Sequence, residues 1–129
     1  MPVPDPSALP AAYEWRDEVY ALPGGLELHF GGRLQAVEIA FRLAGARGAP
    51  IVAALGGISA GRDVFGLQPG AAGWWQGVVG PGRALDTDRF RVLGVDFLGG
   101  SHRTTGPADG AAFPSISAFD QARVLVALM

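Results

Sequence analysis

Cysteine and lysine are both absent from this 129-residue chain, and histidine occurs only twice. Without thiols the chain cannot form a disulfide, a thiolate nucleophile or a cysteine-ligated zinc site. Without lysine it cannot form a Schiff base or the phosphate-binding lysine of a P-loop. His29 and His102 lie too far apart in the sequence to form a local metal-ligand pair. The sequence therefore predicts no metal site and no bound cofactor.

An excess of positive charge and a long apolar run are missing as well. Ten arginines stand against twelve acidic residues, for a net charge of -2. A chain with this balance has no excess positive charge that would attract nucleic acid or an anionic membrane surface. The first residues also lack the basic and continuously apolar segments of a signal peptide, and no apolar run approaches membrane-spanning length. We expect a cytoplasmic protein that binds neither nucleic acid nor membranes.

Glycine and proline are plentiful, with 20 and 10 residues, while 49% of the chain is hydrophobic and 17% is charged. This composition favours a packed core joined by glycine-rich loops over a disordered chain. The length suits one domain. We assign residues 1–12, which are proline-rich and lack periodicity, to an N-terminal arm, and residues 13–129 to the domain.

Four segments carry the pattern of strands. Residues 26–30 and 37–43 alternate apolar with polar or small side chains, and Gly31-Gly32 between them predicts an antiparallel hairpin. Residues 51–55 and 91–97 are nearly continuously apolar, which is typical of central parallel strands covered on both faces. The connection between these last two is too long to lack structure, so we expect a helix near residues 73–79.

The last segment is predicted to be a helix that begins at Ser117 and runs toward Met129. Ser117 and Asp120 have the spacing of a capping box, in which the serine hydroxyl accepts from the first-turn amides. The apolar residues predicted to form its buried stripe are Phe119, Ala122 and Val126, with Leu125 and Met129 beside them. No glycine cap or polar tail follows, a pattern that fits equally a truncated domain and a complete small domain whose last helix packs on its sheet.

Residues 57–61 fit the G-x-S-x-G pattern of serine hydrolases, and Ser59, Asp96 and His102 follow in the order serine, acid, histidine. A nucleophile elbow needs a helix that begins directly after the serine, so that its amides face the oxyanion. Glycine and proline follow too closely here for a sustained helix. We interpret Ser59 as a loop residue and keep a small Ser59 hydrolase as an alternative.

Several other residues could bind a ligand. Trp74 and Trp75 could stack on one, but large aromatic residues on a short helix are more often core residues, which is our interpretation here. Arg83 and Arg103 could meet a carboxylate or phosphate, although an exposed loop arginine is the commoner outcome. We expect His29 to occupy the polar face of its strand.

The region from 73 to 107 has the order of motifs of one enzyme family. It contains Gly-Trp-Trp at 73–75, Val-Gly-Pro-Gly at 79–82, Ala-Leu-Asp-Thr-Asp-Arg-Phe at 84–90, Leu-Gly-Gly at 98–100 and Thr-Gly-Pro at 105–107. This block resembles the homoserine O-acyltransferases, enzymes of the α/β-hydrolase fold. The resemblance implies an α/β fold: the N-terminal part of an α/β-hydrolase domain, with an antiparallel edge hairpin followed by parallel strands and crossover helices, truncated before the nucleophile.

The resemblance also implies a reaction and a site. Such enzymes transfer acetyl or succinyl from coenzyme A to the hydroxyl of homoserine in methionine biosynthesis, with acyl-coenzyme A as a co-substrate. By position, the Leu55 backbone N–H becomes an oxyanion-hole donor, while Gly56, Gly57 and Arg62 become candidates for the substrate pocket. Family members often have His-Ala-Leu-Thr-Gly here, where this chain has Ala53 and Gly56 in place of the histidine and threonine. The acceptor amino acid is therefore left open.

The nucleophile, acid and base of such an enzyme are expected beyond residue 129, so we expect this chain to be inactive alone. Small-molecule substrates are the implied partners, and a homodimer is compatible with the sequence. A non-catalytic interaction fragment, which binds another chain through an exposed strand edge, is the third hypothesis.

Overall fold

The computed structural model describes residues 12–57, 59–68, 70–100, 102–108 and 112–129. Residues 1–11, which make up most of the predicted N-terminal arm, lie outside these ranges. The chain divides into two compact units: Met1–Glu18 with Phe41–Val95, and Val19–Ala40 with Asp96–Met129. Each unit has its own apolar core and is described separately.

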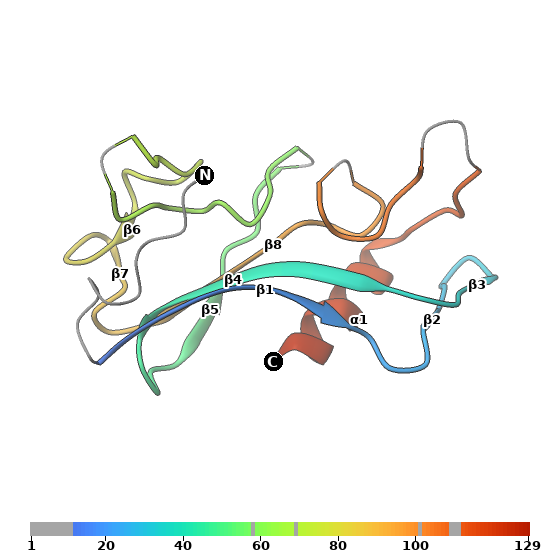
Figure 1. Cartoon of the computed structure of the whole chain (residues 1–129), viewed down its shortest axis with the longest axis horizontal. Helices are drawn as coiled ribbons and strands as arrows, with labels where there is room; N and C mark the ends of the chain where they lie inside the picture. Colours follow the sequence, from blue (N-terminus) through green and yellow to red (C-terminus); the bar gives the residue numbers. More distant parts are fainter. Residues whose placement is uncertain (1–11, 58, 69, 101, 109–111) are drawn as a thin grey trace. The chain divides into compact units, whose positions relative to one another are not determined.

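The main sheet has four strands in the order β1-β4-β8-β5 (Figure 1). Their bounds are Tyr13–Ala21 for β1, Glu38–Ala46 for β4, Arg91–Val95 for β8 and Ile51–Ala53 for β5. β8 runs antiparallel to β4 and parallel to β5, with Ile51 opposite Arg91 and Ala53 opposite Leu93. The parallel pairing predicted for 51–55 and 91–97 is confirmed, although each strand is shorter than expected. The expectation that both are central and covered on both faces does not hold for β5, which is last in the strand order and half-buried.

β1 pairs with β4 and was missed by the sequence analysis. Arg47 N donates to Ala12 O at 2.7 Å and Leu22 N donates to Val37 O at 2.8 Å. These hydrogen bonds lie at opposite ends of the two strands, so β1 and β4 run antiparallel. The antiparallel edge pair of the fold is therefore β1 with β4.

The prediction that residues 26–30 pair with residues 37–43 is wrong. β2 (Leu26–Glu27) instead pairs with β3 (Arg33–Leu34) in a separate two-stranded sheet. Gly31 and Gly32 turn the chain back with φ of 98° and 85°, a region that glycine enters without a steric penalty. This local turn brings residue 33 to residue 27, so the first segment closes on itself before β4 begins.

The first unit has a buried cluster at its centre. Its members are Tyr13, Ala44, Ala54, Val64, Phe65, Val79 and Val92. The ring of Phe65 is 2% exposed and meets the indole of Trp15 edge-on, with centroids 5.7 Å apart. Phe65 lies in the connection between β5 and β8, so this connection is part of the core and not a surface loop.

No helix occurs among the described residues between β5 and β8, so the helix predicted near 73–79 is wrong. The segment makes a single turn, in which Val79 N donates to Trp75 O at 3.1 Å. It then enters β6 (Val79–Gly80), which pairs in parallel with β7 (Leu85–Asp86). Gly77 within the turn and Gly80 after it are weak helix formers, which explains why one turn is not extended.

The second unit contains α1 (Ala118–Leu128). Ser117 caps this helix, and the predicted capping box is confirmed because Ser117 accepts from Asp120 N while the Asp120 carboxylate accepts from Ser117 N. Burial raises the pKa of Asp120, but the hydrogen bonds from the Ser117 and His29 backbone N–H groups lower it by more than burial raises it. The pKa of Asp120 therefore lies below its ordinary value. Within the described ranges, no helix has the length and apolarity to cross a bilayer.

The buried face of α1 differs from the predicted stripe. Phe119, Val126 and Met129 are 64%, 76% and 67% exposed. The buried residues of the helix are Asp120 and Val124, and Val124 joins the core of the second unit. The capping carboxylate sets this rotation, because Asp120 also accepts from His29 N at 3.0 Å.

Replacing Ser117 with alanine is expected to lower the free energy of unfolding by about 1 kcal/mol, because a first-turn amide loses its acceptor. The midpoint of urea unfolding, followed by circular dichroism at 222 nm, measures the change. Ser115→Ala is the matched control because Ser115 is exposed and precedes the cap. Equal midpoints for the two variants would contradict the capping role.

Candidate functional site

The turn after β5 is the centre of the candidate site. β5 ends at Ala53, and Ala54 N still donates to Leu93 O of β8 at 2.9 Å. The next residue, Leu55, is 52% exposed. Because β5 and β8 are parallel, this turn lies at their carboxyl edge, where open α/β sheets bind ligands.

Gly56 allows Trp74 to pack on this turn. A Cβ atom at Gly56 would lie 2.4 Å from the Ala60 Cβ and 3.1 Å from Cζ2 of Trp74. The indole Nε1 of Trp74 also donates to Gly61 O at 2.8 Å. Trp74 therefore contacts both ends of the segment from Gly56 to Gly61. A threonine at position 56 would not fit this arrangement without displacing Ala60 or the indole.

Trp74 and Trp75 lie side by side with near-parallel rings. Their centroids are 5.6 Å apart at an interplanar angle of 18°, and the residues are 37% and 41% exposed. Our interpretation of this pair as core residues on a helix is therefore wrong. Their backbone N–H groups donate to Asp63 O and Val64 O, so both tryptophans are hydrogen-bonded to the loop after β5.

Arg62, a predicted substrate-pocket residue, is bound to a strand. Its Nε donates to Asp17 Oδ1 on β1 at 2.8 Å. Asp17 Oδ2 accepts from Arg42 Nη2 on β4 at 2.9 Å, and Arg42 Nη1 lies 2.7 Å from Asp63 Oδ1. Burial raises the pKa of Asp17, but the hydrogen bonds and charges of the two arginines outweigh it and hold the pKa below its ordinary value.

Asp17 and Arg42 were not predicted from the sequence as site residues. One signal was available: in the alternation of residues 13–21, Asp17 occupies a position expected to be apolar. A charge at such a position needs a paired partner, since an unpaired buried carboxylate is costly. Because lysine is absent, arginines elsewhere in the chain were the permanently charged residues that could supply that partner.

The residues of the alternative triad are found in different parts of the chain. Ser59 is exposed in a turn of the first unit, and no helix follows it among the described residues up to β6. Asp96 and His102 belong to the second unit. There, Asp96 is 1% exposed and its carboxylate accepts from Arg103 N at 3.1 Å, while His102 is exposed. The expectation that no helix opens at Ser59 is confirmed.

The remaining candidates lie at the surface. Arg83 is exposed beside a groove of about 420 Å³. Arg103 pairs with Glu38 at 2.6 Å, and His29 stacks on Phe119 with centroids 4.5 Å apart. Among the residues that the structure describes, no group of three His, Asp or Glu side chains is arranged to hold a metal ion.

Curated relatives of this sequence have closely related names. The chain is 39% identical over 139 residues to a homoserine O-acetyltransferase of Clavibacter michiganensis subsp. michiganensis, an alignment that covers 92% of this chain and 36% of the relative. It is 36% identical over 110 residues to a homoserine O-succinyltransferase of Dechloromonas aromatica, an alignment that covers 74% of this chain and 29% of the relative. The chain belongs to the homoserine O-acyltransferase family. A serine O-succinyltransferase of Stenotrophomonas maltophilia is 34% identical over 83% of this chain and 32% of the relative.

Solved structures show the same fold. The homoserine O-acetyltransferase from Bacillus anthracis superimposes with a TM-score of 0.74 at 21% identity, over 88% of this chain and 36% of that one. Esterase E22 superimposes with a TM-score of 0.73 at 23% identity, over 90% of this chain and 36% of the esterase chain. The chain is thus a partial α/β-hydrolase fold that spans about a third of the length of these acyltransferases. No protein-family model matches the sequence.

Proposed function

We propose that this chain is part of a homoserine O-acyltransferase and that the Leu55 backbone N–H is one of its oxyanion-hole donors. The observation that carries the proposal is the 39% identity to a homoserine O-acetyltransferase over 92% of this chain. The turn at Leu55 supports it, because the residue is exposed at the carboxyl end of β5 and its neighbour Gly56 is packed under Trp74.

The chemistry of this proposal is acyl transfer from a coenzyme A thioester to the hydroxyl of an amino acid. A serine takes the acyl group and releases coenzyme A, and the acceptor hydroxyl then attacks the acyl-serine. Each step passes through a tetrahedral intermediate with a negative oxygen, which a fixed N–H group stabilises. We place the serine, acid and base outside residues 1–129, since the matched region is only 36% of the acetyltransferase.

A chimera tests the proposal directly. Residues 1–129 replace the matched region of the Clavibacter homoserine O-acetyltransferase, and coenzyme A release is measured with acetyl-coenzyme A and homoserine. We expect release well above that of a chimera whose transplanted segment is scrambled. If the two chimeras are equally inactive while the parent enzyme is active, the proposal fails.

The chain alone is expected to show no turnover and no labelling by a fluorophosphonate probe. Ser59 lacks the following helix that would hold a reactive serine beside oxyanion donors. Gel fluorescence of the wild type and of Ser59→Ala, with a known serine hydrolase as positive control, measures this. Labelling that is present in the wild type and lost in the variant would establish the Ser59 hydrolase instead.

A further inference from the structure

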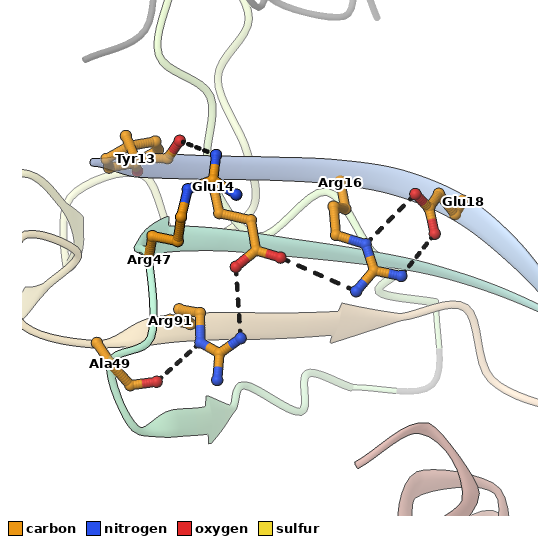
Figure 2. Close-up of polar contacts among 7 residues, drawn as sticks. All are labelled: Tyr13, Glu14, Arg16, Glu18, Arg47, Ala49 and Arg91. Atoms are coloured by element: carbon orange, nitrogen blue, oxygen red, sulfur yellow. Dashed lines mark hydrogen bonds and ion pairs between the residues drawn. The ribbon is translucent and has the colours of Figure 1, made fainter. Parts of the chain in front are cut away.

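β1 carries charged side chains on both of its faces. Glu14, Arg16 and Glu18 alternate along the strand, and Figure 2 shows Glu14 between Arg16 and Arg91. Glu14 lies 3.9 Å from Arg16 and 3.3 Å from Arg91, while Arg16 and Glu18 form a 2.7 Å pair. The side chains of Arg16 and Glu18 are 45% and 50% exposed, so this pair contributes little to stability.

The other face of β1 contains Asp17, which belongs to a chain of four alternating charges. The order is Arg62, Asp17, Arg42 and Asp63, with contacts of 2.8, 2.9 and 2.7 Å. The side chains of Arg42 and Asp17 are only 4% and 13% exposed. Two positive and two negative groups balance, and the two outer members are consecutive residues of the loop after β5.

This loop is also fixed against the sheet. A Cβ atom at Gly94 of β8 would lie 2.5 Å from Arg62 O, so the loop backbone passes directly over the strand at that point. One residue earlier, Gly61 O accepts from the Trp74 indole. The loop that starts at Leu55 is thus held at three successive residues, and two of the three are held through the charge chain.

We propose that Asp17 is a positioning residue for the turn that carries the Leu55 N–H. It binds Arg62 of the loop and Arg42 of β4 at the same time. The loop therefore cannot move from the sheet without separating Arg62, whose side chain is 27% exposed, from the 13% exposed carboxylate of Asp17. The role in catalysis rests on the proposed function, because it requires Leu55 to be an oxyanion donor. The role in holding the loop does not.

Protonation of Asp17 should release this hold. The charged groups that face it are Arg42 from β4 and Arg62 with Asp63 from the loop. Since the folded-state pKa of Asp17 is lowered, its contribution is complete above the ordinary carboxyl pKa and is lost as the pH falls through the folded value.

Amide hydrogen exchange of the 129-residue chain tests the hold. The reporters are the N–H groups of Trp74 and Trp75, whose acceptors are the loop carbonyls of Asp63 and Val64. In Asp17→Asn we expect their protection factors to fall by about tenfold or more, with the amides of α1 unchanged. The control Glu18→Gln, on the opposite face of β1, should leave all of them unchanged. In the wild type, but not in Asp17→Asn, the protection should also fall on acidification below the ordinary carboxyl pKa.

If Asp17→Asn does not fold, Arg62→Gln is used in its place, because it keeps the Asp17–Arg42 pair. It should lower the protection factors of the same two amides, those of Trp74 and Trp75. Unchanged protection of Trp74 and Trp75 in whichever variant folds, or an equal loss in α1, overturns the positioning role. When it is introduced into the chimera, the variant that folds should lower kcat with little change in KM. If protection falls but kcat is unchanged, Asp17 does hold the loop, and the assignment of the Leu55 N–H as an oxyanion donor fails.

Discussion

Phe65→Ala is expected to lower the free energy of unfolding of the first unit by about 3–5 kcal/mol. The phenyl ring is 2% exposed, contacts Trp15 edge-on and lies in the central cluster of the unit, so its removal leaves a cavity that the sheet cannot close. A loss of this size is a large part of the stability of a small domain.

Tryptophan fluorescence during urea unfolding measures this loss, because Trp15, Trp74 and Trp75 all belong to the first unit. Phe30→Ala is the matched control: the same atoms are removed from a side chain that is 69% exposed. We expect its midpoint to stay close to that of the wild type. A similar shift for both variants would mean that Phe65 is not a core residue.

Leu55→Pro, made in the chimera, is expected to lower kcat by about 10²–10³-fold, the effect of losing one oxyanion donor. Proline removes the N–H group at this position, and its ring also fixes the backbone φ at about −65°. The preceding residue, Ala54, directly follows β5, and its own N–H donates to Leu93 O of β8, a hydrogen bond that a proline at position 55 does not remove.

Leu55→Ala is the control for this substitution because it removes the exposed side chain and keeps the N–H group. We expect it to retain most of the kcat of the chimera. If proline and alanine reduce kcat equally, the side chain and not the amide is responsible, and the assignment of Leu55 as an oxyanion donor fails. The KM for homoserine serves to separate a binding defect from a loss of transition-state stabilisation.

The sequence predicted those parts of the fold in which local pattern and tertiary environment agree. β5 and β8 are short apolar segments, and they form the parallel pair that such segments predict, with β8 mostly buried and β5 half-buried. The Ser117–Asp120 capping box is a local interaction that needs no distant partner. The position of the Leu55 turn followed from the same strand and from the family resemblance.

Two of the misses, β1 and the buried face of α1, have a common physical cause, which is that a distant partner determined the structure. β1 was missed because Asp17 interrupts its apolar alternation, and only Arg42 and Arg62 make that carboxylate acceptable inside the unit. The buried face of α1 was misassigned because Asp120, polar by composition, is enclosed by its hydrogen bonds to Ser117 and His29. No pattern within either segment contains this information.

The Trp74–Trp75 stack gives the protein a built-in optical probe. Two indoles 5.6 Å apart at 18° couple their excited states, whereas Trp15 has no indole partner in the described structure. Their exciton signal in circular dichroism depends on the relative orientation of the rings, and the ring of Trp74 contacts Gly56. A change in the couplet would therefore report movement of this turn without any label, for instance when a thioester substrate is added to the chimera.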